Sequence, residues 1–140
     1  MIEWYKKVVF ENYANFNGRA RRSEYWYFVL AQILIIFGVI AIGSFIGTFF
    51  NSSEDGFLIA FGIVGIYLLA ILIPYLALIV RRMHDIGKSG WFYLVRFIPV
   101  IGGIWILVLL CTEGNYGENN YGLDPKEEFD EINEIGSKEA

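Results

Sequence analysis

Long stretches without a charged residue constrain this chain of 140 residues more than any other feature. Apolar runs cover residues 25–50, 57–80 and, apart from Arg96, 91–112. The hydrocarbon core of a bilayer is about 30 Å thick, and a helix needs roughly 20 apolar residues to cross it. Apolar residues make up 56% of the chain and charged residues only 19%. This amount of apolar surface exceeds what a small soluble core can bury. We therefore predict an all-α integral membrane protein with three transmembrane helices and short loops, and exclude a disordered chain, a disulfide-rich domain and an ordinary soluble enzyme.

The third run departs from a simple span. It contains Arg96, Pro99 and the pair Gly102 and Gly103, so it either crosses the membrane or forms a kinked or re-entrant segment. Arg96 lies near its start, where the side chain can reach the interface or pair with Glu24 or Asp85. Small residues that can seat helices against each other occur in the first two runs: Gly43, Gly47, Gly62 and Gly65.

The regions outside the spans differ in character. Apolar residues at helical spacing, from Ile2 to Phe16, predict an amphipathic helix over about residues 2–16. This helix either lies in the membrane interface or packs on the cytoplasmic ends of the spans. We expect residues 1–125 to form the membrane domain and residues 126–140 an acidic tail that is disordered or folds on a partner.

The distribution of Lys and Arg predicts the orientation, because these residues concentrate in short cytoplasmic flanks. Five lie in residues 1–24, none in the first loop at 51–56, and three in the second loop at 81–90. This pattern places the N-terminus and the second loop in the cytoplasm and the first loop outside. The tail is outside if the third run crosses the membrane and cytoplasmic if it does not.

The predicted topology brings residues 16–26 and 81–91 to the same cytoplasmic face. We interpret their charged side chains, with Arg96, either as a basic pocket for the phosphate of an anionic lipid headgroup or as an internal ion-pair network. The candidate residues are Arg19, Arg21, Arg22, Glu24, Arg81, Arg82, His84, Asp85, Lys88 and Arg96.

Features of catalytic or metal sites are sparse. His84 and Asp85 are the pair that most resembles acid–base machinery, but neighbours on a helix point about 100° apart and need not face one target. One histidine and one cysteine, Cys111, at the end of an apolar run, offer too few ligands for a metal site. We expect no metal, no cofactor and no catalytic residue.

Four sequence motifs follow one another in a fixed order along the chain. F-N-G-R-A-R-R-S-E-Y-W precedes the first run, R-R-M-H-D-I-G-K-S-G-W joins the second to the third, I-P-V-I-G lies within the third, and G-x-N-x-Y-G-x-D-P follows at residues 117–125. In this order they resemble the Domain of Unknown Function 805 family of small bacterial inner-membrane proteins. The resemblance covers about residues 10–125 and implies a multi-span protein of the bacterial cytoplasmic membrane without an established activity.

These observations favour a non-enzymatic interaction or envelope-associated component that binds anionic lipid headgroups at its cytoplasmic basic face. Two alternatives stay open, a subunit of a small oligomeric transporter or channel and a membrane enzyme acting on lipid headgroups through His84 and Asp85. Membrane lipids are the expected partners, a second copy or another membrane protein remains open, and nucleic acid is not expected.

Overall fold

A computed structural model describes residues 1–49 and 53–126. Its elements in chain order are α1 (Ile2–Lys6), η1 (Lys7–Glu11), α2 (Arg22–Phe49), α3 (Ser53–Asp85), η2 (Gly90–Phe97) and α4 (Ile101–Cys111). Helices and loops make up this part of the chain, with one isolated β-bridge between Asn119 and Gly122. The chain divides into two compact units: residues 1–13 with 26–75, and residues 14–25 with 76–140. The long helices α2 and α3 contribute residues to both units.

Helices α2 and α3 follow the first two apolar runs and are long enough to cross a membrane. At 1.5 Å per residue, their 28 and 33 residues correspond to about 42 and 50 Å. Glu54 and Asp55 occupy the first turn of α3, where negative charge suits the helix dipole, and Arg82 places a positive charge in its last turn. The apolar run of α3 ends at Val80, so we take residues 57–80 as its membrane-spanning part and residues 81–85 as a polar extension.

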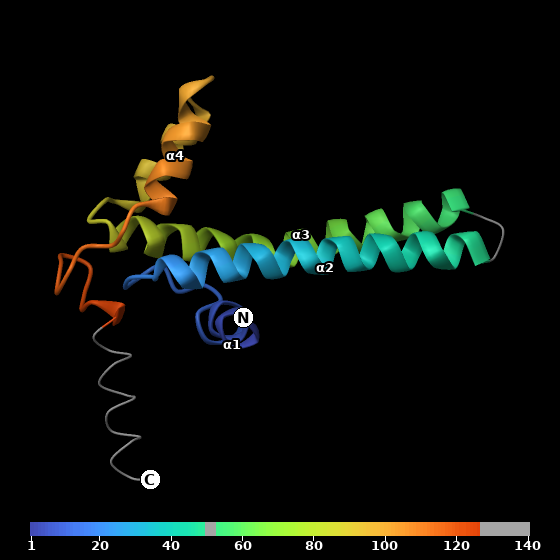
Figure 1. Ribbon diagram of the computed structural model, residues 1–140, viewed down its shortest axis with the longest axis horizontal. Helices are drawn as coiled ribbons and strands as arrows, with labels where there is room; N and C mark the ends of the chain where they lie inside the picture. The colour runs from blue at the N-terminus through green and yellow to red at the C-terminus, as the bar shows by residue number, and fades with distance from the viewer. Residues whose placement is uncertain (50–52, 127–140) are drawn as a thin grey trace, which may run out of the picture. The chain divides into compact units, whose positions relative to one another are not determined.

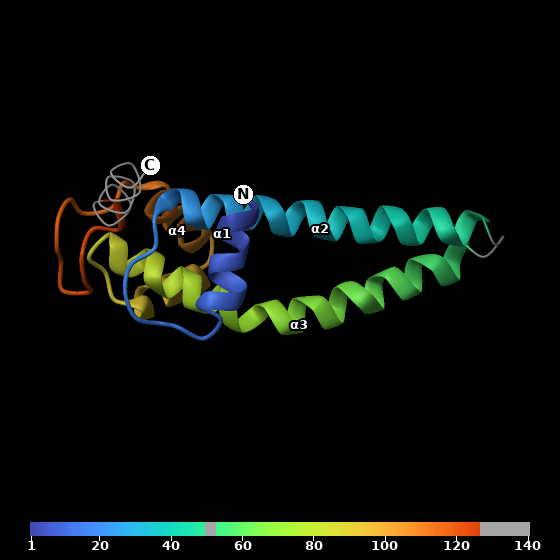
Figure 2. The same ribbon diagram turned by 90° about the horizontal axis from the view of Figure 1, so that it is seen from below.

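In the first unit, the N-terminal helices lie against the two long helices (Figures 1 and 2). The Tyr5 ring stacks on Phe28 of α2 at 5.8 Å, and its hydroxyl lies 3.2 Å from that of Tyr67 on α3. The Tyr13 hydroxyl donates to the carbonyl of Ala70 at 2.7 Å. The helical region ends at Glu11, five residues before the predicted end at 16. It ends there because Asn12 leaves the helical conformation, and the side-chain amide of Asn12 donates to the Lys7 carbonyl at 3.0 Å. These contacts join the N-terminal segment to α2 and α3, and the partners on α3 lie in the middle of its apolar run. The amphipathic character and the choice between the two predicted roles stay predictions.

Close packing joins α2 to α3 within the first unit, where the small residues allow the backbones to approach. A Cβ atom added at Gly43 would lie 2.5 Å from the Ala60 side chain. One added at Gly56 would lie 2.6 Å from both the Gly43 carbonyl and the Gly47 Cα atom. Gly62 and Gly65, predicted to pack helices in the same way, have no such neighbour within 4 Å among the described residues.

The third apolar run is not one helix. The expected span at 91–112 is divided by residues 98–100 into η2 and α4, since Pro99 lacks an amide hydrogen and Val100 adopts φ 68°, ψ −50°. The Ile101 amide donates to the Pro99 carbonyl at 2.8 Å, which closes a γ-turn on Val100. Helix α4 has 11 residues, or about 16 Å, roughly half the thickness of a hydrocarbon core.

Both ends of this run lie beside the last turns of α3, within the second unit. At the start, a Cβ atom added to Gly90 would lie 2.7 Å from the Val80 side chain. At the end, the carbonyls of Leu110 and Thr112 accept hydrogen bonds from Arg82. Residues 90–112 therefore leave the end of α3 and return to it.

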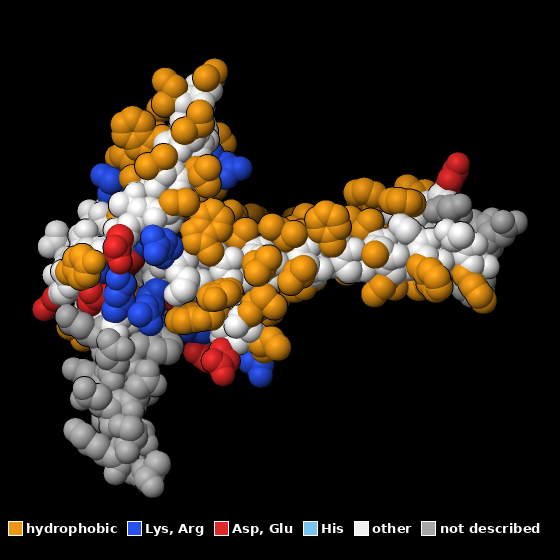
Figure 3. Space-filling model, in the orientation of Figure 1, with side chains coloured by type: hydrophobic (Ala, Val, Ile, Leu, Met, Phe, Trp, Pro, Cys, Tyr) orange, Lys and Arg blue, Asp and Glu red, His pale blue; other side chains and the backbone are white. Residues whose placement is uncertain are grey.

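Large apolar side chains cover the surfaces of the long helices and of α4 (Figure 3). Phe37 of α2 is 70% exposed, Ile66 of α3 73% and Val108 of α4 58%. Water would not tolerate so much exposed apolar surface, whereas lipid chains solvate it without cost. The described surface is therefore that of an integral membrane protein.

Candidate functional site: a buried ion-pair network

Asp85, the last residue of α3, is the centre of a buried ion-pair network in the second unit. Its Oδ1 atom accepts from Arg19 Nε at 3.0 Å, and its Oδ2 atom accepts from Arg82 Nη1. The side chains of both arginines are at most 1% exposed and that of Asp85 is 6% exposed. Burial raises the pKa of the Asp85 carboxyl, and the positive charges of Arg82 and Arg19 oppose that rise.

The two arginines use their remaining donors on backbone carbonyls. Arg19 donates to Gly117 at 2.6 Å and to Asn115, and Arg82 donates to Leu110 at 3.3 Å and to Thr112. A guanidinium offers five donors in a fixed planar fork, which suits such multiple bonding. The network thus connects three separate segments: the one before α2, the end of α3 and the chain after α4.

A second buried pair ties the start of α2 to α3. Arg81 Nη1 donates to Glu24 Oε1 at 3.1 Å, with side chains 3% and 1% exposed. The Arg81 backbone joins in, because its carbonyl accepts from the Ala20 amide at 3.0 Å. Of the two interpretations of the charged cluster, these distances support an internal ion-pair network for Arg19, Glu24, Arg81, Arg82 and Asp85.

His84 has partners different from those of Asp85. Its Nδ1 atom lies 3.1 Å from the Gly18 carbonyl, and its ring stacks on Tyr121 at 3.9 Å. Since a carbonyl can only accept, Nδ1 carries the hydrogen and Nε2 of the neutral ring is an acceptor. Burial lowers the pKa of the His84 imidazole, against the opposing effect of the bond to Gly18. The two side chains that would form an acid–base pair therefore bond different groups: Asp85 bonds two guanidinium groups, and His84 bonds a backbone carbonyl.

The loop after α4 supplies parts of the network that the sequence reasoning did not assign. Gly114 lies directly against the Asp85 carboxylate, where a side chain would clash. The Asn119 side chain donates to the His84 carbonyl at 3.0 Å. Asp124 accepts from the amides of Gly117 at 3.1 Å and Lys126 at 2.9 Å, and so folds the loop onto itself. Asn119 and Asp124 belong to the motif at 117–125, which periodicity alone describes only as turns, and Gly114 lies before that motif.

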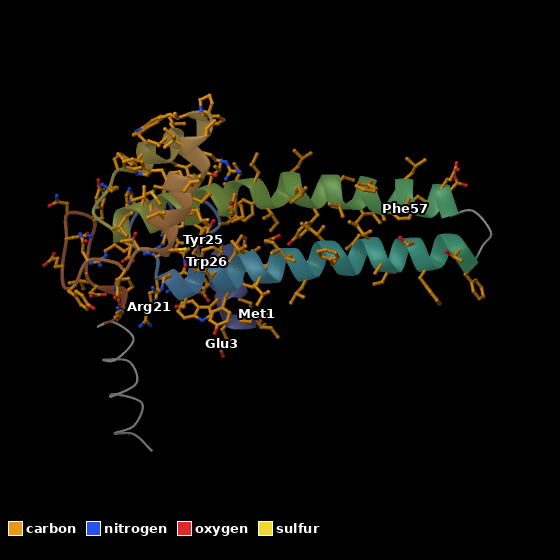
Figure 4. The ribbon with its side chains drawn as sticks, turned by 45° about the horizontal axis from the view of Figure 1, so that its top comes forward. Met1, Glu3, Arg21, Tyr25, Trp26 and Phe57 are labelled. Atoms are coloured by element: carbon orange, nitrogen blue, oxygen red, sulfur yellow. The ribbon has the colours of Figure 1, made fainter. Side chains whose placement is uncertain are left out.

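Three further candidate cations, Arg22, Lys88 and Arg96, have partners other than the carboxylates of the network. Arg22, exposed at the start of α2, donates to the Cys111 carbonyl at 3.4 Å. Lys88 lies over the Phe92 ring at 4.8 Å. Arg96 donates to the Tyr93 hydroxyl at 3.1 Å, and no ion pair with Glu24 or Asp85 is seen in the described part of the chain. Arg21, labelled in Figure 4, directly precedes α2.

A small pocket of about 140 Å³ adjoins the first turn of α2. Its cationic lining comes from Arg21, Arg22 and Lys126, and its other lining residues are Ser23, Asp85, Glu113, Gly114, Asn115, Asp124 and Pro125. Lys126 pairs with Glu113 at 2.6 Å, which lowers the pKa of the Glu113 carboxyl and raises that of the Lys126 ammonium. The pocket combines a helix N-terminus with two guanidinium groups, and both features favour anions.

The part of the chain that the structure describes contains no group of three His, Cys, Asp or Glu side chains able to hold a metal ion. The interactions that the described residues of the second unit can form are ion pairs, hydrogen bonds to carbonyls and attraction of anions.

Comparisons with known proteins find a matching family model and similar proteins. Residues 13–123 match the family model described as protein of unknown function (DUF805). The chain is 42% identical over 125 residues to the inner membrane protein YhaI of Escherichia coli strain K12, an alignment that covers 89% of this chain and 97% of YhaI. It is 39% identical to the inner membrane protein YhaH of the same strain, over 89% of this chain and 98% of YhaH. No solved structure matches the chain.

Proposed function

We propose a function on the premise that this chain belongs to the DUF805 family and is similar to the inner membrane proteins YhaI and YhaH: it is a non-enzymatic component of the bacterial inner membrane that binds the phosphate of anionic lipid headgroups. The binding site is the pocket lined by Arg21, Arg22 and Lys126. We call it the anion pocket.

The division of the cations carries this proposal. Arg19, Arg81 and Arg82 are buried and each is paired with a carboxylate, so they hold the unit together. Arg21 and Arg22 instead line a pocket at the N-terminus of a 28-residue helix. The carboxylates of this pocket are engaged, Asp85 by two arginines, Glu113 by Lys126 and Asp124 by backbone amides. A phosphate would meet the helix dipole and two bidentate donors.

The proposal includes an orientation. The N-terminal flank is basic, so the anion pocket faces the cytoplasm, and α2 and α3 cross the membrane. Residues 90–112 enter the membrane from the cytoplasmic side and return to that side, since both ends adjoin the end of α3. The acidic segment that follows is then cytoplasmic.

Native mass spectrometry of the protein extracted from its membrane tests the anion pocket. We expect wild-type protein to retain anionic lipid and the double variant Arg21→Gln/Arg22→Gln to lose it, because a hydrogen bond to a charged group contributes about 1.5–3 kcal/mol, at least tenfold in affinity. The matched control is Lys6→Gln/Lys7→Gln, which removes the same charge from the same flank but not from the pocket. Equal loss of lipid in both double variants would contradict the proposal, since it would reflect net charge alone.

A further inference from the structure

A second cavity in the same unit has a different character from the anion pocket. It is a groove of about 570 Å³, within the range of roughly 300–1,000 Å³ common for small-molecule sites. Its apolar walls are formed by Leu76, Ile79 and Val80 of α3 and by Trp91 and Leu94 of η2. These residues are the end of one apolar run and the beginning of the next.

The groove is open to the surroundings of the apolar segments. Trp91 is 80% exposed and Leu94 52% exposed, although both belong to an apolar run. Tryptophan is enriched at the boundary between hydrocarbon and headgroups, which places the mouth of the groove at that level. The molecules available to an apolar groove at this boundary are lipids, with a chain in the groove and a head at its polar end.

The polar side chains that line the groove are those of Asn17, His84, Ser89 and Tyr93, which we call its polar end, and no Lys or Arg of the described residues lines the groove. The Tyr93 hydroxyl accepts from Arg96, which lies outside the lining. The His84 Nδ1–H is used on the Gly18 carbonyl, so Nε2 is left as a hydrogen-bond acceptor. The serine hydroxyl and the asparagine carbonyl are further acceptors, and the Trp91 ring offers a face to a cation. Acceptors and an aromatic ring without a cation suit a head that donates hydrogen bonds and carries positive charge.

We propose that this groove binds one phospholipid with a primary-ammonium headgroup of the ethanolamine type, its acyl chain between α3 and η2 and its ammonium donating to His84 Nε2. The groove and the anion pocket are distinct sites with different lining residues, so this inference stands apart from the proposed function.

Photo-crosslinking in nanodiscs tests the groove. The probes are phosphatidylethanolamine, phosphatidylcholine and phosphatidylglycerol that carry the same diazirine-labelled acyl chain, and cross-linked peptides are read by mass spectrometry. We expect at least a threefold excess of cross-links to residues 76–80 and 91–94 for the ethanolamine probe, because choline has no N–H and glycerol no positive charge. Equal cross-linking by any two probes that include phosphatidylethanolamine would overturn the ammonium assignment.

Two matched pairs of variants distinguish binding of the acyl chain in the groove from recognition of the headgroup. Leu94→Trp fills the groove and should abolish these cross-links, while Leu107→Trp on α4, also 52% exposed but outside the groove, should not. His84→Gln keeps a polar amide near the position of Nε2 and should keep the preference for ethanolamine. His84→Asn keeps a donor near Nδ1 but lacks the Nε2 acceptor, and should lose that preference while the acyl chain still cross-links.

Separate outcomes would contradict the groove and the role of His84. Unchanged cross-linking in Leu94→Trp would overturn the groove as the site, and an unchanged preference in His84→Asn would overturn the role of Nε2. A large increase after deletion of residues 127–140 would show that the groove holds the chain's own tail instead. Arg21→Gln/Arg22→Gln should leave the ethanolamine preference intact, so failure of the anion pocket and failure of the groove are distinguishable.

Discussion

Asp85 is the residue on which the second unit most depends, because one carboxylate forms ion pairs with two buried guanidinium groups. Substitution Asp85→Asn removes this charge and leaves Arg19 and Arg82 buried without a counter-charge. Loss of one partner from a buried pair costs about 3–5 kcal/mol. We expect a clearly lower melting temperature of the purified protein in detergent, measured by circular dichroism.

The control for this substitution is Glu113→Gln, which removes a carboxylate from an exposed pair with Lys126. Exposed ion pairs contribute little to stability, so its melting temperature should match the wild type. Melting of Asp85→Asn at the wild-type temperature would show that the network does not stabilise the unit.

At this scale the sequence predicts which residues matter but not how they are used. The charged residues that form the buried ion pairs are all among the predicted candidates, whereas Asp124 is not. The choice between a headgroup pocket and an ion-pair network depends on burial, which sequence spacing does not reveal. The sequence contains two similar pairs of adjacent arginines beside apolar runs, at 21–22 and 81–82. Arg81 and Arg82 are buried, whereas Arg22 is exposed. Asn115 and Asp124 act through backbone contacts, and such contacts depend on a loop fold that no periodic pattern predicts.

At the scale of elements, the two long helices depend on glycine where their backbones meet. Substitution Gly56→Ala would push a methyl group against the backbone of Gly43 and Gly47, which cannot move as a flexible side chain would. Such overpacking costs about 1–3 kcal/mol. The matched control is Gly62→Ala on the same helix, which meets no atom within 4 Å and also gains helix propensity.

We expect Gly56→Ala to melt at a lower temperature and Gly62→Ala at the wild-type temperature or above it. The same order should hold for resistance to unfolding by sodium dodecyl sulfate. Equal effects of the two substitutions would mean that the close approach of α2 and α3 is absent from the protein in detergent.

The third apolar run shows what composition cannot decide. Its hydropathy and length satisfy the requirement for a span, and Pro99 with two glycines only indicated that the helix could be interrupted. The actual break combines proline at 99 with a positive φ at Val100, a β-branched residue for which that conformation is strained. A sequence rule assigns such a conformation to glycine or asparagine, so the turn is set by the contacts of η2 and α4 with their surroundings and not by local preference.

At the scale of the whole molecule, the path of residues 90–112 determines, in the proposed orientation, on which side of the membrane the loop after α4 lies. A crossing segment would carry its two ends about 30 Å apart. Here the start adjoins Val80 and the end is bonded to Arg82, two residues apart on one helix. The network that binds Arg19 to the carbonyls of Asn115 and Gly117 adds the same constraint, because both partners must lie on one side.

Single cysteines in a Cys111→Ser background test this topology with a membrane-impermeant maleimide. The positions are Asn15 before α2, Glu54 at the start of α3 and Glu118 in the loop after α4. In inverted membrane vesicles we expect labelling at 15 and 118 but not at 54, and in spheroplasts the opposite. Labelling of 118 together with 54 would mean that residues 90–112 cross the membrane, and Arg19 could then not reach the carbonyls of residues 115 and 117. Because that contact would fail, the same result would also remove the anion pocket, whose walls come from both segments. The topology experiment therefore tests the proposed site as well as the path of the chain.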